Sequence, residues 1–158
     1  MATIQLCKSV IIARLHGLLR LRPATSPVRL DCLGAECGLC CKVFGGSITL
    51  SEREENRLVQ IGAAALDVQG AVVLGHKGSC CSHLQGNLCT IYMDRPRSCQ
   101  EYPWYSINGS LYFDKGCPGI KNDIDGRPEP SALIPFEVYI RALPRTLQVI
   151  VTWLIRNW

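Results

Sequence analysis

Cysteine is the residue whose number and spacing most clearly point to chemistry in this chain. Nine of its ten cysteines lie between residues 32 and 117, and four of those fall between Cys32 and Cys41. Packing alone does not require thiols at this density. Such thiols could form disulfides, act as a redox-active pair, fill the core as small apolar groups or bind metal as thiolates.

The first three explanations each account for only part of the set. The sequence shows no export signal, so a reducing compartment is the default, and disulfides are not favoured there. Cys37 and Cys40 have the spacing of a redox dithiol, but Cys41 follows at once and no βαβ pattern surrounds them. Buried, inert cysteine suits Cys7 and is open for Cys80.

Metal binding accounts best for the remaining cysteines. The C-x2-C unit of Cys37 and Cys40 predicts a tight turn that aims two sulfurs at one ion. Cys89 and Cys99, ten residues apart, could close the site from another side. On an extended chain, neighbouring side chains point to opposite faces. Cys40 and Cys41 are therefore expected to serve different metals or different irons of one cluster, unless one of them is not a ligand.

Three stretches of the sequence resemble a known family: CLGAECGLCCKVF, CCSHLQGNLCTIYMDRPRSCQEYPW and KGCPGI. The resemblance is to the CxxCxxCC cysteine-cluster family (YkgJ type), a zinc- or iron-chelating domain, and it runs from about Cys32 to Ile120. One spacing departs from the signature, because four residues separate Cys32 from Cys37 where the family has two. The resemblance implies a metal-ligand set of Cys32, Cys37, Cys40, Cys41, Cys81, Cys89, Cys99 and Cys117.

The identity of the metal and the role of the protein stay open at this stage. Zinc and an iron–sulfur cluster such as [4Fe-4S] both accept four thiolates, so eight sulfurs could hold two ions, or four could hold one cluster. The first hypothesis is an electron-transfer or accessory protein. The second is a metal-dependent enzyme or methyl-transfer auxiliary, since a similar cluster occurs in flagellin lysine-N-methylase. The third is a structural zinc module that binds a protein partner through its terminal helices.

Other polar residues near the cysteines have two interpretations each. Arg95 and Arg97 could offset the negative charge of a metal–thiolate centre. Alternatively, Asp94 and Arg97 form a weak surface pair on a helix that Asp94 caps. His76 and His83 could bind metal, but solvated side chains on a Gly- and Ser-containing loop are the better interpretation.

The expected fold is α+β, a small cysteine-rich metal-binding domain with short hairpins and flanking helices. Residues 1–29 form an N-terminal amphipathic helix and linker, residues 30–120 the metal-binding domain, and residues 121–158 a helical extension packed on the same domain. In the N-terminal helix, Ile11, Leu15 and Leu18 are expected to face the core.

Local signals predict several elements. Ser51 and Glu54 form a capping box for a helix that ends at Gly62, with Leu58 and Ile61 facing inward. Residues 63–75 are ambiguous, with a short helix before a strand as one interpretation. Hairpin turns are expected at residues 86–87 and 108–109. Pro144 should divide the tail, and its expected core stripe is Leu147, Ile150, Val151 and Leu154.

Size and charge limit the remaining possibilities. The 158 residues suit one domain, and the scattered net charge of +4 does not indicate a nucleic-acid partner. No apolar run is long enough to suggest a transmembrane segment. The expected location is cytoplasmic. Five basic and no acidic residues before Asp31 keep organelle targeting as an alternative.

Overall fold

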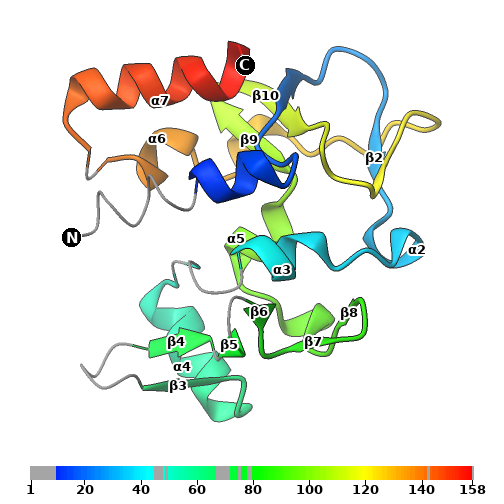
Figure 1. Cartoon of the computed structure of the whole chain (residues 1–158), viewed down its shortest axis with the longest axis vertical. Coiled ribbons are helices and arrows are strands. Elements are labelled where there is room, and N and C mark those ends of the chain that lie inside the picture. Colours follow the sequence, from blue (N-terminus) through cyan, green and yellow to red (C-terminus); the bar gives the residue numbers. More distant parts are fainter. Residues whose placement is uncertain are drawn as a thin grey trace. The chain divides into compact units, whose positions relative to one another are not determined.

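The computed structural model describes residues 10–44, 48, 50–66, 72–74, 76–77, 80–141 and 143–157. Its short helices and small antiparallel sheets confirm the predicted α+β class (Figure 1). The chain divides into two compact units. The terminal unit comprises residues 1–35 and 101–158, and the central unit comprises residues 36–100. Within the described ranges, none of the helices has the length and apolarity needed to cross a membrane.

Residues 10–15 form the N-terminal helix. The later helices are α2 (Cys32–Ala35), α3 (Leu39–Phe44), α4 (Glu52–Gln60), α5 (Arg97–Glu101), α6 (Phe136–Tyr139) and α7 (Arg145–Asn157), with the 3₁₀ helices η1 (Tyr92–Asp94) and η2 (Pro130–Ala132). The strands are β1 (Leu21–Pro23), β2 (Arg29–Leu30), β3 (Ala64–Leu66), β4 (Val72–Leu74), β5 (His76–Lys77), β6 (Cys80–Cys81), β7 (Leu84–Gln85), β8 (Leu88–Cys89), β9 (Trp104–Ile107), β10 (Ser110–Asp114) and β11 (Ile120–Lys121).

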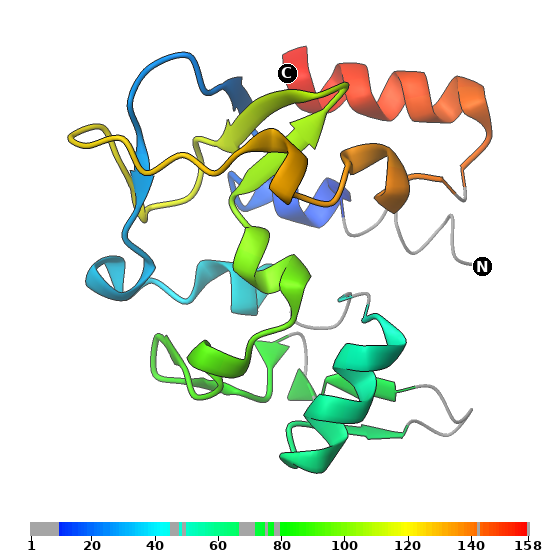
Figure 2. The same ribbon diagram turned by 180° about the vertical axis from the view of Figure 1, so that it is seen from behind.

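The terminal unit is built on an antiparallel sheet in the order β1–β10–β9 (Figures 1 and 2). The predicted turn at Asn108 and Gly109 joins β9 to β10, and both residues have positive φ, 49° and 74°. Two successive residues with positive φ make the type I′ turn that suits the twist of a hairpin. This prediction is therefore confirmed.

Side chains alternate across this sheet and supply two cores. Tyr112 and Ile107 belong to the core that α6 and α7 complete with Phe136 and Ile155. Trp104 packs in a second core, whose other buried members are Val28 and Leu133. Because the period of a strand is two, one short sheet can serve both cores.

Asp114, at the end of β10, is fully buried in the terminal unit. Its carboxylate accepts hydrogen bonds from the backbone N–H groups of Leu19 (2.6 Å), Arg20 (3.0 Å) and Gly116 (2.9 Å), and from the Tyr102 hydroxyl (3.3 Å). One acidic side chain thus holds the segment after the N-terminal helix against the sheet.

The predicted faces of the two terminal helices are partly wrong. In the N-terminal helix, Ile11 and Leu15 are 59% and 82% exposed, and Ala13 is buried instead. Leu18 is buried as expected, but it lies beyond the helix. Helix α7 begins directly after Pro144, as predicted.

The buried side of α7 is also displaced from the predicted stripe. Ile150 is 50% exposed and Leu147 is 37% exposed, whereas Ile155 is buried and Val151 packs against the core. Both helices carry apolar residues on several sides, so their apolar spacing did not define one face.

In the central unit, helix α4 begins with the predicted capping box. The Glu54 carboxylate accepts hydrogen bonds from the Ser51 backbone N–H (2.8 Å) and hydroxyl (2.6 Å). Gly62, with φ of 69°, follows the helix end. Leu58 is buried as expected, but Ile61 is half exposed, which corrects the predicted face.

Small hairpins make up much of the rest of the central unit. Strands β3 and β4 pair antiparallel, so the residues that could have begun a helix after Gly62 are a strand. Residues 67–71 lie outside the described part. Strands β7 and β8 pair across the predicted turn at Gly86 and Asn87. Leu58 of α4 forms a core with Ala63 and with Leu74 of β4.

Candidate metal centre

Five thiols of the central unit lie within interaction range of one another. Helix α3 supplies Cys40 and Cys41, β6 supplies Cys81, β8 supplies Cys89, and α5 supplies Cys99. The Cys41 thiol is within hydrogen-bonding reach of the sulfurs of Cys40, Cys81 and Cys89, and Cys99 interacts electrostatically with three of the others. Four separate elements thus bring together residues that lie up to 59 positions apart in the sequence.

The adjacent cysteines Cys40 and Cys41 lie on a helix and not on the extended chain that their prediction assumed. The expectation that they serve different ions assumed an extended chain, but residues 39–44 are helical. On a helix, successive side chains diverge by about 100° and can meet on one side. The Cys40 and Cys41 sulfurs are in fact hydrogen-bonded to each other, so the geometric premise is wrong.

The turn between Cys37 and Cys40 depends on a glycine. Gly38 has φ of 55°, and a Cβ added there would lie 2.8 Å from Leu84 Cδ1 and 3.0 Å from the Asn87 carbonyl oxygen. The β7–β8 hairpin therefore packs directly against the start of α3. Cys37 is half-buried immediately before this turn.

Cys80 and Cys81 illustrate the other geometry, because they form strand β6. Cys81 is buried and in reach of Cys41, whereas Cys80 is only half-buried. Strand alternation turns the two side chains to opposite faces. Of this pair, only Cys81 was predicted as a ligand.

The close approach of the thiols shifts their pKa values in opposite directions. The hydrogen bond with Cys41 lowers the pKa of Cys40 to about 7 and that of Cys89 to about 6, against the opposing effect of burial. The same bonds strongly raise the pKa of Cys41. Burial, reinforced by the neighbouring sulfurs, raises the pKa of Cys99 to about 12. The cluster thus contains two thiols that ionise easily beside two that do not.

The two remaining predicted ligands, Cys32 and Cys117, belong to the terminal unit. Strands β2 and β11 pair there, and the Asp31 backbone N–H donates to the Gly119 carbonyl at 2.8 Å. This pairing places the segments that carry Cys32 and Cys117 side by side. Cys117 is buried and Cys32 half-buried.

Histidine contributes no evident ligand in the described part of the chain. His83 Nε2 lies 2.6 Å from the Ala63 carbonyl oxygen, so this nitrogen acts as a donor. His83 is half-buried and thus neither the solvated side chain that was expected nor a ligand through Nε2. The side chain of His76 lies outside the described residues.

The donor set fits a soft, thiolate-binding metal. In the ranges that the structure describes, no three cysteine, histidine or acidic side chains are already arranged to hold an ion. The sulfurs instead make contacts with one another, and soft sulfur donors are those that zinc and iron–sulfur clusters prefer. The Ser98 hydroxyl, next to Cys99, is buried and has no hydrogen-bond partner among the described residues. This orphaned donor lies on the helix that supplies one of the thiols.

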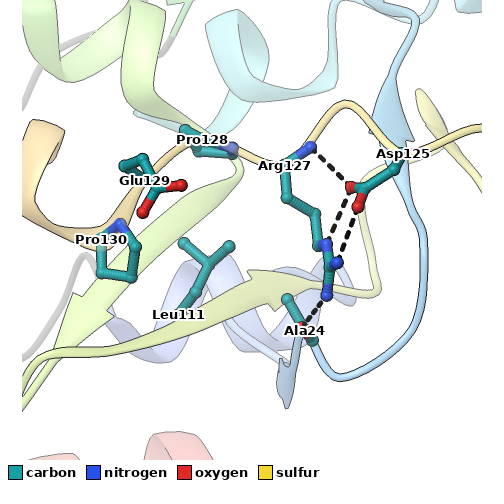
Figure 3. A pocket seen from close by; sticks show the side chains of 7 residues that line it. All are labelled: Ala24, Leu111, Asp125, Arg127, Pro128, Glu129 and Pro130. Atoms are coloured by element: carbon teal, nitrogen blue, oxygen red, sulfur yellow. Dashed lines mark hydrogen bonds and ion pairs between the residues drawn. The ribbon is translucent and has the colours of Figure 1, made fainter.

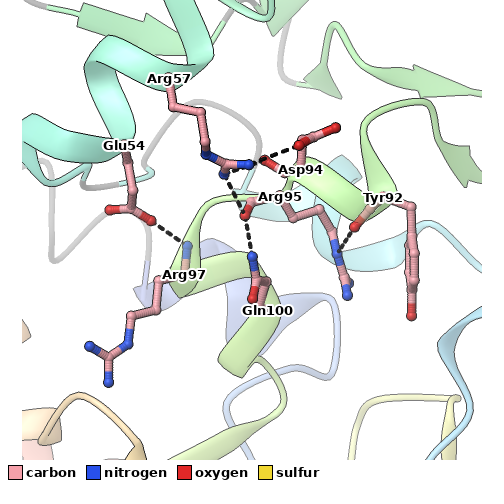
Figure 4. Close-up of polar contacts among 7 residues, drawn as sticks. All are labelled: Glu54, Arg57, Tyr92, Asp94, Arg95, Arg97 and Gln100. Carbon is pink, nitrogen blue, oxygen red and sulfur yellow. Dashed lines mark hydrogen bonds and ion pairs between the residues drawn. The ribbon is translucent and has the colours of Figure 1, made fainter. Parts of the chain in front are cut away.

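A group of charged residues, which the sequence had not connected, surrounds η1 and α5 (Figure 4). Arg57 of α4 forms an ion pair with Asp94 at 2.9 Å. Glu54 accepts a hydrogen bond from the Arg97 backbone N–H at 2.5 Å. Asp94 is thus engaged by Arg57, whereas the sequence had suggested Arg97 as one possible partner. Arg95 Nε donates to the Tyr92 carbonyl at 2.9 Å, and its guanidinium lies over the Tyr92 ring.

The terminal unit has a separate hollow of about 320 Å³ (Figure 3). Asp125 and Arg127 close part of it through a bidentate pair at 2.7 and 2.8 Å. Arg127 also donates to the Ala24 carbonyl at 2.8 Å, so its guanidinium already has hydrogen-bond partners within the protein. The hollow contains none of the predicted cysteine ligands.

The clustered thiols are typical of cysteine-rich, metal-chelating domains. The chain belongs to the CxxCxxCC family, described as "Putative zinc- or iron-chelating domain", which matches residues 31–118, more than half of the sequence. The predicted resemblance is therefore confirmed, and membership supports metal binding in general. No curated protein and no solved structure matches the chain.

Proposed function

We propose that the central unit binds an iron–sulfur cluster or a zinc ion through cysteine thiolates. One observation supports this most strongly: helix α3 and two strands bring the thiols of Cys40, Cys81 and Cys89 into reach of Cys41, and α5 adds Cys99, which interacts electrostatically with those three. The proposed ligands are drawn from Cys40, Cys41, Cys81, Cys89 and Cys99. Cys37, one turn before Cys40, is an additional candidate.

Cys32 and Cys117 are proposed as ligands on separate grounds. Their segments lie side by side in the terminal unit. Both residues lie within residues 31–118, the range that the family model matches. Two thiols are fewer than the four that a structural zinc ion takes. These two thiols alone therefore do not complete such a site.

The two candidate occupants would give the domain different roles. An iron–sulfur cluster supplies one-electron transfer, whereas four-coordinate zinc supplies folding free energy. In either case the chain has to lose thiol protons on binding, and the lowered pKa values of Cys40 and Cys89 favour that step. The raised pKa values of Cys41 and Cys99 oppose it.

Anaerobic purification followed by iron, sulfide and zinc analysis tests the proposal. A brown protein with visible thiolate-to-iron absorption and stoichiometric sulfide identifies a cluster, and a colourless protein with stoichiometric zinc identifies zinc. Cys41→Ser should lose the metal. Cys80→Ser is the matched control, because it removes a neighbouring thiol outside the contact group and should retain the metal. Wild-type protein that folds without iron or zinc and binds neither would refute the proposal.

We further propose that the terminal helices contact a protein partner. Trp153 and Val149 on α7 are 60% and 66% exposed, and Leu15 on the N-terminal helix is 82% exposed. Large apolar side chains exposed on these helices favour an interaction surface. A photocrosslinker placed at Val149 should capture one protein reproducibly, whereas one placed at the exposed Lys121 should not. Equal labelling from both positions would contradict this proposal.

A further inference from the structure

The guanidinium group of Arg95 is held in a fixed position in the central unit. Its carbon lies 3.7 Å from the centroid of the Tyr92 ring, and its Nε donates to the Tyr92 carbonyl at 2.9 Å. The Arg95 carbonyl accepts a hydrogen bond from Gln100 Nε2 at 2.6 Å. Stacking and backbone contacts therefore fix both ends of this residue before any ligand binds.

Arg95 nevertheless makes no ion pair with a carboxylate in the described part of the chain. Other arginines there do: Arg57 pairs with Asp94, Arg29 with Asp123 and Arg127 with Asp125. Asp94 precedes Arg95 directly, but its carboxylate forms an ion pair with Arg57 (Figure 4). A half-buried guanidinium without an anionic partner is costly unless negative charge arises nearby.

The groups that can supply this charge are the thiols. Arg95 interacts electrostatically with Cys40, Cys89 and Cys99, which come from three different elements. In the metal-free protein these thiols carry only part of the charge of a loaded site. Four thiolates around a divalent metal carry a net charge of about −2, so metal loading increases the negative charge that faces Arg95.

We infer that Arg95 is the built-in counter-ion of the metal–thiolate centre, a positioning residue that favours the loaded state by offsetting its negative charge. This inference rests on the proposed metal binding. It predicts that the charge of Arg95, more than its packing, controls metal affinity. Outer groups that support metal ligands typically change affinity by about 10- to 100-fold when they are removed.

The test measures Zn²⁺ and Co²⁺ affinity by competition with a chromophoric chelator, for the full chain and three variants. Arg95→Gln should weaken binding of both metals by about 10- to 100-fold. Arg95→Lys keeps the charge without the planar stacking and should recover most of the affinity. Arg97→Gln is the matched control, because it removes the same charge two residues away, where the side chain points away from Arg95 (Figure 4).

The Co²⁺ spectra and the stability of the metal-free protein distinguish a charge effect from a packing effect. Arg95→Gln should keep the tetrahedral thiolate spectrum at saturation and leave the urea midpoint of the metal-free protein unchanged. Affinity equal to wild type in Arg95→Gln would overturn the inference. So would equal losses in Arg95→Lys and Arg95→Gln, which would mark a packing role. If Arg95→Gln does not fold, Arg95→Met, which also removes the charge, takes its place in the comparison with Arg95→Lys. Wild-type protein that binds neither metal would refute the proposed function itself.

Discussion

Asp94 forms its ion pair with Arg57 of helix α4 and not with Arg95, its neighbour in the sequence. The Arg57 Nη1 to Asp94 Oδ1 distance is 2.9 Å, and the same guanidinium donates to the Asp94 carbonyl at 2.8 Å. The pair connects α4 to η1 within the central unit, and it keeps the carboxylate away from Arg95. Its side chains are 39% and 51% exposed, so its own contribution to stability is small.

Replacing Arg57 should therefore affect metal binding more than stability. Arg57→Gln is expected to lower the free energy of unfolding by about 1 kcal/mol or less. Because it releases Asp94 to pair with Arg95, it should also weaken Zn²⁺ binding. Urea denaturation and chelator competition measure the two effects. Arg53→Gln, an exposed change on the same helix, is the control. Equal metal affinity in both variants would contradict the competition between the two arginines.

Glu54 connects the start of α4 to the start of α5, and its replacement should destabilise the protein in a pH-dependent way. Partial burial raises the pKa of Glu54, but hydrogen bonds from the Arg97 backbone and Ser51 outweigh it and leave the pKa below its usual value. Its contribution is thus complete above the usual pKa of about 4.3 and is lost as the pH falls through the lower folded-state value.

Glu54→Gln should cost about 1 kcal/mol at neutral pH. Urea midpoints of wild type and Glu54→Gln, measured from pH 7 to pH 3, should converge at the acidic end. Glu52→Gln provides the control, since it removes the same charge from an exposed position in the same turn. A difference that persists unchanged at pH 3 would exclude the ionised carboxylate as its source.

Elements specified by neighbouring residues were predicted well. The capping box of Ser51 and Glu54, the two hairpin turns and the break at Pro144 depend on contacts within a few positions of the chain. Such signals act before tertiary packing, so the sequence alone reveals them. The cysteine family was recognisable for the same reason, because its spacing is local.

Features that depend on distant packing were not predictable in this way. Cys40 and Cys41 were treated as extended, but they lie on a helix that follows the turn at Gly38, where the β7–β8 hairpin packs closely. Ile61 and Leu15 were predicted to face the core, but both are exposed to solvent. The buried side of each helix depends on tertiary contacts. Asp114 gave no sequence signal at all, because its partners lie as many as 95 residues away.

Asp114 should be among the most sensitive polar positions in the terminal unit. Asp114→Asn leaves fewer acceptors for the four donors that now share its carboxylate, and an unsatisfied buried donor is costly. We expect a loss of about 2–3 kcal/mol in the free energy of unfolding. Asp123→Asn, which removes an exposed carboxylate paired with Arg29, should change the free energy of unfolding far less. Equal losses in urea denaturation would show that Asp114 has no special role.

The two sides of α7 should respond differently to truncation. Ile155 is 1% exposed and Val149 is 66% exposed on the same helix. Ile155→Ala should cost about 2–4 kcal/mol, because it leaves a cavity in the core of the terminal unit. Val149→Ala should change the free energy of unfolding by about 0.5 kcal/mol or less. A large loss for Val149→Ala would mean that another part of the protein covers this side of α7.

In the folded, metal-free protein, the reactivity of each clustered thiol should follow its pKa. At pH 7 Cys89, with a pKa of about 6, is mostly thiolate, whereas Cys99, with a pKa of about 12, is a neutral thiol. Since the thiolate is the nucleophile, iodoacetamide should modify Cys89 well before Cys99, and this labelling should slow as the pH falls below 6.

Cys41→Ala removes the hydrogen bond that lowers the pKa of Cys89, so the pKa of Cys89 should return toward about 8.5 and its labelling at pH 7 should slow. Cys80→Ala, outside the contact group, should leave the rate unchanged. Peptide mass spectrometry after timed quenching identifies the order of modification, with circular dichroism to verify that each protein is folded. Faster labelling of Cys99 than of Cys89 would contradict the arrangement in which Cys41 is the common hydrogen-bonding partner.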